Sequence, residues 1–571
     1  LHGLERWDDA RPRAGIRSLM QPVMTPVVDA RATGDVLLAV ARTAGGALAR
    51  FTAPGWEAHL RQAWGAFGAS RGAADANRFW LDALQRGGVF EAGPAPEAVR
   101  LSADAGGIGY TAPPFDGEGD FVFLATPSPM LFDGRGANKP WLLENPDPVT
   151  KITWHSWAEI SPGTARQLDL REGEIVRLAS AHGAIEVPVY VYPGIRDDVI
   201  AVPLGLGHTE YGEFARGRGA NALGLIGPGA GGFVPYAGSR VQVTKTRGYR
   251  KLAKTEGNPR ELGRHITGTI PLAHAQRGLT LEESLKDLGG AEHELNTPRE
   301  LEAIGGFREN HVERRKLGDY PNWSMPGRAE PQPQWGMVID LAKCTGCSAC
   351  VTACYAENNI PWVGDEEVVR GREMSWLRIE RYYQGGTEPG EPVGARVIPM
   401  LCQHCDNAPC EPVCPVYASY HTADGLNGQV YNRCVGTRYC GNNCPYKVRY
   451  FNWYAYNNRA WPAPMDLQLN PEVTVRSRGV MEKCTFCVQR IRGAQNQARL
   501  EDRPLRDGDV VTACQQACPS GAIVFGNARD PESRVAKAMQ DARGYHVIEE
   551  INTRPNVTYL AKVVHSTEAH G

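Results

Sequence analysis

Fifteen cysteines are the residues of this chain best suited to chemistry, and all of them lie between residues 344 and 518. They form four groups: Cys344, Cys347, Cys350 and Cys354; Cys402, Cys405, Cys410 and Cys414; Cys434, Cys440 and Cys444; and Cys484, Cys487, Cys514 and Cys518. Such crowding indicates a local set of thiolate ligands rather than disulfides, and an odd number of cysteines cannot all pair.

The spacing within the groups is typical of iron–sulfur ligands. Three cysteines on one tight loop can reach three irons of a cube, and in two-cluster ferredoxins the last cysteine of the run binds the other cluster. The first group therefore pairs with the fourth, and the second with the third. The predicted sites are Cys344, Cys347, Cys350 and Cys518 (site 1); Cys484, Cys487, Cys514 and Cys354 (site 2); Cys402, Cys405, Cys410 and Cys444 (site 3); and Cys434, Cys440 and Cys414 (site 4). Structural zinc takes two separated pairs of ligands, which explains the fourth group tolerably and the first hardly at all.

Site 4 lacks one thiolate because Thr437 stands where the second cysteine of its group belongs. A threonine hydroxyl is a poor iron ligand at neutral pH, since it would have to lose a proton of far higher pKa than a thiol. We therefore predict three [4Fe–4S] clusters and one [3Fe–4S] cluster, with Thr437 at the open corner. The alternative is a fourth [4Fe–4S] cluster whose last iron binds hydroxide, water or the Thr437 oxygen.

The segments that must position these loops suggest an α+β protein of several domains. Residues 1–118 carry apolar residues at helical spacing, interrupted by Gly and Pro, and predict a helix-rich domain without chemistry of its own. Residues 119–245 contain short apolar runs that alternate with polar residues, and predict a small β-barrel. Residues 246–334 predict an extended connector. Residues 335–571 repeat a strand, a cysteine loop and a short helix, which indicates an internal duplication.

Several classes of function are excluded or left without support. A net charge of −2 over 571 residues recommends no nucleic acid partner. No run approaches the roughly 18–20 apolar residues that span a bilayer, so any membrane association requires another subunit. We find no catalytic triad or paired acid/base carboxylates and expect no catalytic residue. The chain begins with Leu1 and no signal peptide is recognisable, so we expect a fragment or a processed end.

Three histidines carry weaker signals. His404 lies between Cys402 and Cys405, where it either tunes a cluster through a hydrogen bond or is an ordinary surface residue. His155 and His208 belong to the predicted barrel, and we expect them to be structural.

Residues 335 to about 530 resemble the four-cluster subunit of complex iron–sulfur molybdoenzymes, such as polysulfide, dimethyl sulfoxide and nitrate reductases. The fifteen cysteines carry this resemblance, together with Pro415, Pro445 and Pro519. Residues 1 to about 245 resemble the C-terminal portion of the molybdopterin-binding large subunit, in the runs Gln21-Pro22-Val23, Thr33–Leu38 and Trp154–Pro162. The last run opens a domain that in those enzymes is a double-psi β-barrel holding one end of the pterin.

The two parts fused in one chain resemble the B subunit of alternative complex III. This resemblance implies an electron-transfer subunit on the periplasmic face of the bacterial inner membrane. Its expected partners are a polysulfide-reductase-C-like membrane subunit that oxidises quinol and cytochrome c subunits, multihaem and monohaem, that receive the electrons. Members of this family are thought to lack molybdenum, so we expect no molybdopterin. The alternative is a molybdopterin oxidoreductase of the polysulfide or dimethyl sulfoxide reductase type, with its catalytic and electron-transfer parts fused.

Overall fold

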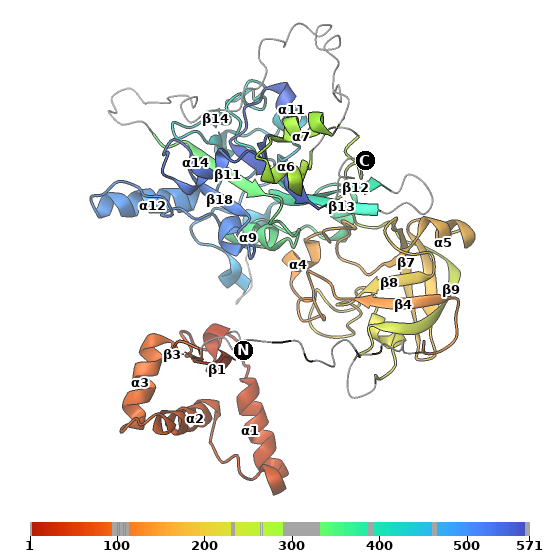
Figure 1. Cartoon of the computed structure of the whole chain (residues 1–571), viewed down its shortest axis with the longest axis vertical. Helices are drawn as coiled ribbons and strands as arrows, with labels where there is room; N and C mark the ends of the chain where they lie inside the picture. Colours follow the sequence, from red (N-terminus) through yellow and green to blue (C-terminus); the bar gives the residue numbers. More distant parts are fainter. Residues whose placement is uncertain are drawn as a thin grey trace. The chain divides into compact units, whose positions relative to one another are not determined.

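The computed structural model describes residues 3–93, 114–229, 234–262, 264, 266–288, 332–385, 393–458 and 465–565, together with positions 100, 102, 107 and 109. The chain divides into two units (Figure 1). The first comprises residues 1–112 with 461–467, and the second comprises residues 113–460 with 468–571.

The first unit combines three helices with a small antiparallel sheet. Its elements are β1 (Asp8–Arg13), β2 (Ile16–Met20), α1 (Thr33–Ala44), α2 (Trp56–Ser70), α3 (Ala76–Arg86) and β3 (Gly88–Phe90), with the strands in the order β1-β2-β3. Helix α3 begins after Asp75, whose carboxylate accepts the N–H of Asn77, and ends at Gly87 in a left-handed conformation. Trp64 and Trp80 are buried between the helices and the sheet. The helices expected in this segment are therefore present, and short strands accompany them.

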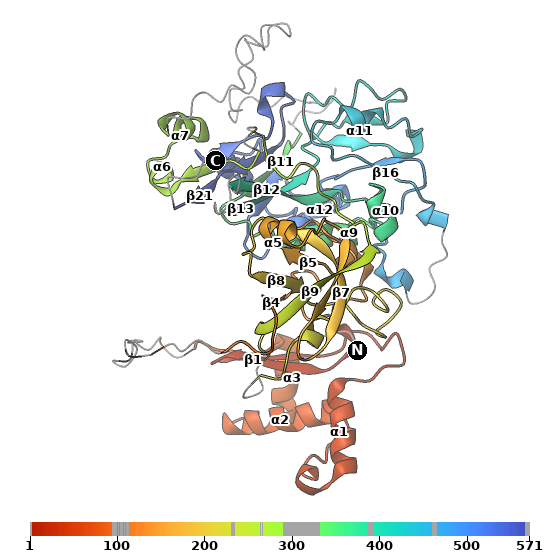
Figure 2. The ribbon, with the colours of Figure 1, turned by 90° about the vertical axis from the view of Figure 1, so that its right-hand side faces the viewer.

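Six strands of the second unit close into a barrel (Figure 2). They are β4 (Phe121–Thr126), β5 (Ala158–Ile160), β6 (Glu174–Ala179), β7 (Ala184–Val191), β8 (Val199–Pro203) and β9 (Ala237–Tyr249), in the order β4-β8-β5-β7-β6-β9. Helices α4 (Pro140–Glu144) and α5 (Pro162–Gln167) belong to the same region. The hydroxyl of Ser161 accepts the N–H of Thr164 at 2.9 Å and starts α5. Strand β9 runs past residue 245, because its pairing with β6 continues to Tyr249.

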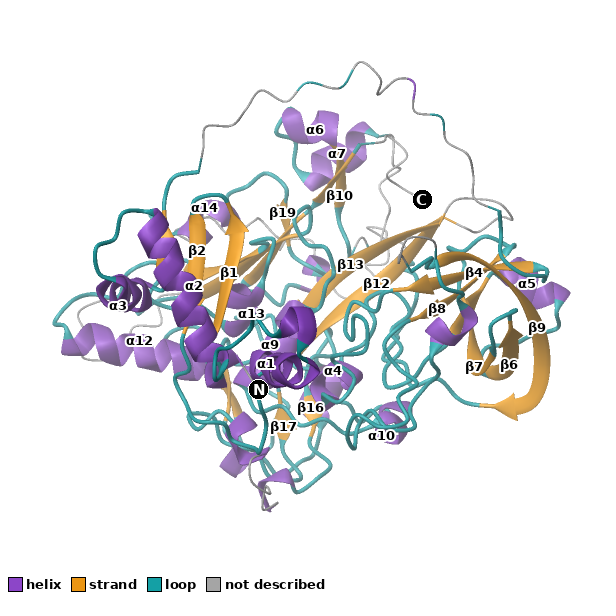
Figure 3. Ribbon diagram, turned by 90° about the horizontal axis from the view of Figure 1, so that it is seen from below, coloured by secondary structure: helices purple, strands orange, loops and turns teal. Residues whose placement is uncertain are grey.

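The cysteine-bearing part consists of small sheets and short helices joined by long loops (Figure 3). One sheet has the order β18-β11-β20-β19, and three hairpins pair β12 with β13, β14 with β15, and β16 with β17. The strands are β11 (Trp335–Asp340), β12 (Leu377–Gly385), β13 (Val393–Leu401), β14 (Ser419–His421), β15 (Asn427–Gln429), β16 (Tyr450–Phe451), β17 (Met481–Glu482), β18 (Ile523–Asn527), β19 (Gly544–Tyr545) and β20 (Val557–Leu560). The helices are α9 (Ala349–Glu357), α10 (Asp365–Val369), α11 (Tyr439–Asn443), α12 (Val488–Leu500), α13 (Ala513–Ala517) and α14 (Arg534–Met539). No described helix is long and apolar enough to cross a bilayer.

The expected connector, residues 246–334, is only partly extended. Its first half contains β10 (Thr269–Pro271), α6 (Leu272–Gln276) and α7 (Leu281–Asp287), whereas residues 289–331 lie outside the described part. Strand β10 pairs in parallel with β21 (Lys562–Val564), near the other end of the sequence. Local patterns do not predict β10, because a three-residue strand shows no alternation and its partner is nearly three hundred residues away.

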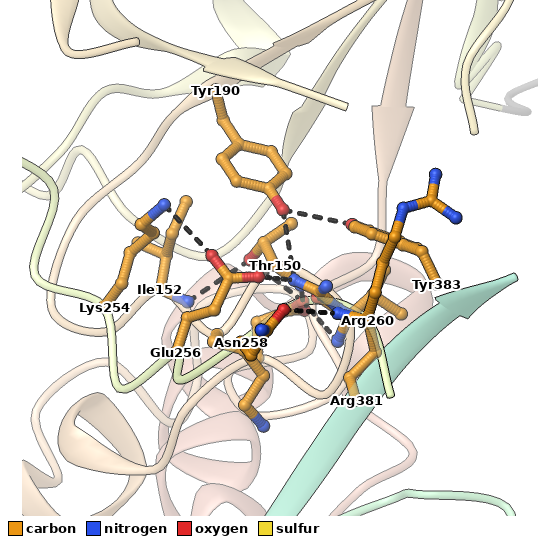
Figure 4. Close-up of polar contacts among 12 residues, drawn as sticks. Thr150, Ile152, Tyr190, Lys254, Glu256, Asn258, Arg260, Arg381 and Tyr383 are labelled. Atoms are coloured by element: carbon orange, nitrogen blue, oxygen red, sulfur yellow. Dashed lines mark hydrogen bonds and ion pairs between the residues drawn. The ribbon is translucent and has the colours of Figure 1, made fainter. Parts of the chain in front are cut away.

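The barrel and the cysteine-bearing part contact each other through buried polar groups. Arg381 on β12 has a fully buried side chain that forms an ion pair with Glu256, which follows the barrel (Figure 4). Its Nε donates to the carbonyl of Val149 at 2.6 Å, and its Nη2 donates to the hydroxyl of Tyr190 at 3.3 Å. The Tyr190 hydroxyl also lies 3.0 Å from the hydroxyl of Tyr383. The two parts thus satisfy each other's buried charges and form one packed unit.

Glu144 forms a second contact of this kind. Its carboxylate, at the end of α4, accepts the N–H groups of Val363 and Gly364 at 2.8 Å each and the indole N–H of Trp154 at 3.2 Å. Burial raises the pKa of Glu144 to about 8, although these donors lower it. The folded chain therefore keeps a proton that an unfolded chain releases near pH 4.5.

We predict that Glu144→Gln removes a pH dependence from the stability of the chain. Stability from a raised carboxyl pKa is complete below about pH 4.5 and declines as the pH rises toward 8, so the wild type should weaken over that range relative to the variant. Thermal unfolding at about pH 5.5 and about pH 8.5 measures the difference. Glu186→Gln, at an exposed position of β7, is the control. Parallel pH profiles of wild type and Glu144→Gln would contradict the prediction.

Candidate iron–sulfur sites

The four cysteine loops share one feature of backbone geometry. The residue two positions after the first cysteine has a left-handed conformation in every loop, with φ values of 71° at Gly346, 45° at His404, 73° at Gly436 and 54° at Phe486. Glycine is required at two of these positions, because a Cβ would lie 2.9 Å from Val397 Cγ2 at Gly346 and 2.5 Å from the Gly479 carbonyl oxygen at Gly436. The loops therefore turn in the same way, although their sequences differ.

The first and third loops match further, and the match places Thr437. Ser348 has a φ of 59° and precedes α9, while Arg438 has a φ of 64° and precedes α11. Cys347 lies between Gly346 and Ser348 as Thr437 lies between Gly436 and Arg438. Thr437 therefore occupies the backbone position of the second cysteine, and both Cys347 and Thr437 are exposed.

The cysteines predicted for sites 2 and 3 are brought together around enclosed cavities. One cavity is lined by Cys354, Cys484, Cys487 and Cys514, and the other by Cys402, Cys405, Cys410 and Cys444. All eight are buried. Among the described residues no three His, Cys, Asp or Glu side chains are placed to hold a metal ion. Each cavity thus combines three cysteines of one group with one cysteine of a distant group, as in two-cluster ferredoxins.

Sites 1 and 4 lie nearer the surface. Burial raises the pKa of the Cys350 thiol well above its usual range. Neighbouring thiols raise it further, and they belong to Cys514, Cys344, Cys347 and Cys518. The predicted members of site 1 are therefore near one another. In site 4, burial raises the pKa of Cys440, Arg449 lowers it, and the thiols of Cys410 and Cys434 raise it further. Arg449 also lowers the pKa of Cys414. Cys414 and Cys440, both predicted for site 4, thus have Arg449 as a common neighbour.

Electrostatic interactions between thiols of different sets indicate a linear order of the predicted sites. Cys350 of site 1 interacts with Cys514 of site 2, Cys484 of site 2 with Cys402 of site 3, and Cys410 of site 3 with Cys440 of site 4. The two inner sites are buried, whereas Cys347 at one end is exposed and Cys414 and Cys434 at the other are partly exposed. The arrangement is a row with both ends at the surface.

Two of the three cysteines that precede a proline, Cys414 and Cys518, accept backbone N–H groups and have lowered pKa values. The N–H of Ala418 donates to Cys414 Sγ and the N–H of Ala522 donates to Cys518 Sγ, at 3.2 Å each. Burial raises the pKa of both thiols, but these and other backbone donors outweigh it and leave both pKa values lowered. The donors therefore stabilise the thiolate form that binds iron.

Cys354 differs because no proline follows it. Helix α9 continues through Tyr355 to Glu357, whereas α11 and α13 end just before Cys444 and Cys518. A proline at position 355 would break α9, since it has no N–H to donate inside a helix. The amide of Asn358 lies 3.5 Å from Cys354 Sγ and donates to it instead.

His404 is fully buried, so its interpretation as a surface residue is wrong. Its Nδ1 accepts the N–H of Asn427 at 3.1 Å, and its ring stacks on Phe486 with the centroids 3.9 Å apart. The stack joins the loop of site 3 to the loop of site 2, and sequence reasoning missed Phe486 because the two loops are far apart along the chain.

His155 is buried and its Nε2 lies 2.7 Å from an Asp365 oxygen, which fits a structural role. His208 stacks on Tyr211.

Comparison with known proteins accounts for both parts of the second unit. Residues 144–229 match the model of the molydopterin dinucleotide binding domain, and residues 393–460 match the model of the 4Fe-4S dicluster domain. Together with the four cysteine loops, these matches define an iron–sulfur protein of mixed α/β structure that carries a molybdopterin-binding type of domain.

The cysteine-bearing part has curated relatives. It is 45% identical over 233 residues to the menaquinone reductase iron-sulfur cluster-binding subunit of Nitratidesulfovibrio vulgaris, which covers 40% of this chain and 89% of that protein. It is 33% identical over 254 residues to the Hdr-like menaquinol oxidoreductase iron-sulfur subunit 1 of Archaeoglobus fulgidus, covering 41% and 86%. The chain belongs to the family of iron–sulfur subunits of the molybdopterin oxidoreductases. A solved structure, acetylene hydratase from Pelobacter acetylenicus, aligns at 15% identity with a TM-score of 0.29 over 43% of this chain and 37% of that one, too weak to bear on the fold.

Proposed function

We propose that this chain is the electron-transfer subunit of a membrane-bound quinol:acceptor oxidoreductase of the alternative complex III type. It would take electrons from quinol oxidised in a polysulfide-reductase-C-like membrane subunit and pass them toward multihaem and monohaem cytochrome c subunits, on the periplasmic face of the inner membrane. The observation that carries this proposal is the single row of four cysteine sites with both ends at the surface. One relative is named for a menaquinol oxidoreductase, which supports quinol as the donor. Another is named for a menaquinone reductase, which supports an exchange of electrons with quinone but in the opposite direction.

The residues proposed to hold the clusters are the fifteen cysteines in the four sets of sites 1–4. When bound, the clusters supply one-electron carriers, three [4Fe–4S] and one [3Fe–4S], the last with Thr437 at its open corner. The chain's own contribution is to bury the inner cysteines and to donate backbone N–H groups to Cys414 and Cys518. The repeated loop geometry also supports an internal duplication of the cysteine-bearing domain.

Exposed apolar side chains at one end of the row fit the proposed membrane partner. Tyr417, Val435 and Tyr439 are 62%, 65% and 57% exposed, and each lies within three residues of a cysteine of site 4. Aromatic side chains are enriched in the cores of protein interfaces. Around Cys347, at the other end, the exposed neighbours are Lys343 and Thr345, which suit a more polar partner such as a cytochrome.

We predict that Tyr417→Asp combined with Tyr439→Asp uncouples the chain from the membrane subunit. Two carboxylates buried in an apolar interface would be desolvated without partners, so quinol-dependent cluster reduction should fall at least tenfold while reduction by dithionite stays complete. Stopped-flow spectroscopy of the reconstituted complex measures both rates. Tyr249→Asp, at an exposed tyrosine at the end of β9, is the matched control. Unchanged quinol-dependent reduction in the double variant would show that this surface is not the docking site.

The fused catalytic molybdoenzyme is the less favoured function. The curated relatives are iron–sulfur subunits, and their alignments cover about 40% of this chain. We propose that the barrel, of the double-psi type, binds no molybdopterin and serves to hold the cysteine-bearing part through contacts such as Arg381 with Glu256. Metal analysis of the purified complex tests this proposal, because stoichiometric molybdenum would overturn it.

A further inference from the structure

Arg449 is a buried guanidinium that donates hydrogen bonds to three neutral side chains and to the thiol of Cys440, and to no described carboxylate. The residue is 7% exposed and immediately precedes β16. Its Nη1 donates to Gln429 Oε1 at 2.8 Å, and its Nη2 donates to Ser419 Oγ at 2.6 Å and to Asn427 Oδ1 at 2.7 Å. The three acceptors belong to the hairpin of β14 and β15, which holds the guanidinium in one orientation.

Other buried arginines of this chain have a carboxylate beside them. Arg476 pairs with Glu482 at 2.9 Å, and Arg381 pairs with Glu256. Arg449 forms no such ion pair with any described carboxylate. Glu411 does not contact the guanidinium directly: it accepts one hydrogen bond from Asn427 Nδ2 and pairs with His421. A charge taken out of water without a counter-charge is strongly unfavourable, so another negative group must lie beside Arg449.

The groups that surround Arg449 are cysteines from two different sites. Cys410, Cys402 and Cys444 of site 3 and Cys440 of site 4 all interact with its charge. Arg449 also lines the cavity that the cysteines of site 3 enclose. Ser419, which accepts from Arg449, is in turn 3.7 Å from Cys410 Sγ. The guanidinium therefore lies between the two sites and belongs to both.

We propose that Arg449 is the shared counter-charge of the groups held at sites 3 and 4 and that it raises the reduction potential of both. A cluster with its thiolates is anionic, and net charge and hydrogen bonding are among the factors that set its potential. A fixed positive charge between two such groups stabilises the added electron on each and offsets the repulsion when both are reduced. The assignment rests on the ligand sets of the proposed function. A counter-charge shared by sites 3 and 4 would let these two sites together hold the two electrons that one quinol releases.

Potentiometric titration of the assembled complex, followed by EPR, tests this role with Arg449→Gln. At a fixed ambient potential, the ratio of reduced to oxidised cluster should fall at least tenfold at two of the four sites, which corresponds to 59 mV for a one-electron couple. The other two sites should shift much less. Arg449→Lys keeps the charge and should keep both potentials. Arg499→Gln, at an exposed position of α12, controls for the loss of one positive charge.

Two results would overturn the proposal. One is an Arg449→Gln variant with full iron content and unshifted potentials, and the other is an Arg449→Lys variant whose potentials fall as far as those expected for glutamine. If Arg449→Gln loses iron, the Arg449→Lys variant alone decides. Unchanged potentials at sites 3 and 4 in that variant would support the role of the positive charge, and lowered potentials would reject it. The titration uses dithionite and mediators, so a failure of quinol to act as donor would not affect its outcome.

Discussion

Replacing Thr437 with cysteine is expected to abolish the EPR signal of an oxidised [3Fe–4S] cluster and to add one iron atom per chain. Thr437 occupies the same backbone position as Cys347, between a left-handed Gly436 and a left-handed Arg438. A new thiolate at this position would complete the fourth corner of site 4, since the loop already has the conformation of a four-cysteine run. Because Thr437 is exposed, the sulfur needs no repacking of the interior.

The same substitution should also lower the potential of site 4. The conversion adds an iron ion together with the thiolate, so it changes the type of cluster, and cluster type is one of the factors that set the potential. Iron and sulfide analysis with EPR of the oxidised complex measures the conversion, and a redox titration measures the potential. Thr437→Ser keeps a hydroxyl at the same position and should leave the signal unchanged. A wild-type complex without a [3Fe–4S] signal would favour the alternative, in which a fourth [4Fe–4S] cluster is completed by an oxygen ligand.

Replacing Arg476 with alanine is expected to destabilise the folded chain strongly. Arg476 and Glu482 form an ion pair at 2.9 Å with side chains 1% and 0% exposed. Glu482 also accepts hydrogen bonds from Asn452 Nδ2 at 2.8 Å and from Trp376 Nε1 at 3.2 Å. Removal of the arginine leaves a buried carboxylate without its counter-charge, which costs about 3–5 kcal/mol.

The damage should extend to site 2, because Glu482 is two residues before Cys484. Thermal unfolding and iron content of the variant measure both effects. The double variant Arg476→Ala/Glu482→Gln should recover part of the loss, since it no longer buries an unpaired charge. Lys537→Ala, which breaks an exposed pair with Glu532, provides the control and should leave the stability nearly unchanged, because water screens such pairs. An Arg476→Ala variant as stable as this control would contradict the prediction.

Local patterns predicted a large part of the chain correctly. The iron–sulfur nature of the cysteine-bearing part and the likeness of the preceding part to a molybdopterin-binding domain are both confirmed by the family matches. A barrel was expected after residue 119, and six strands close there. These features could be predicted because cysteine spacing, strand alternation and helix starts such as Ser161 are properties of short stretches of sequence.

Contacts between distant segments could not be predicted in this way. His404 and Phe486 stack although about eighty residues separate them, and this contact decided that His404 is buried rather than exposed. Strand β10 acquires its partner only from the end of the chain. Arg449 looks like any other charged residue in the sequence, and only the hairpin of β14 and β15 shows that it is buried between two sites.

The cysteines themselves show where the division falls. The sequence alone determined which residues offer sulfur, that they form four groups, and that Thr437 interrupts the third, because each group lies within one short segment. The tertiary structure decided which cysteines of different loops are neighbours, which of them are buried, and which charge lies beside Cys402, Cys410, Cys440 and Cys444. These properties depend on how loops from distant segments pack, and that packing is set by long-range burial of apolar and charged groups rather than by local spacing.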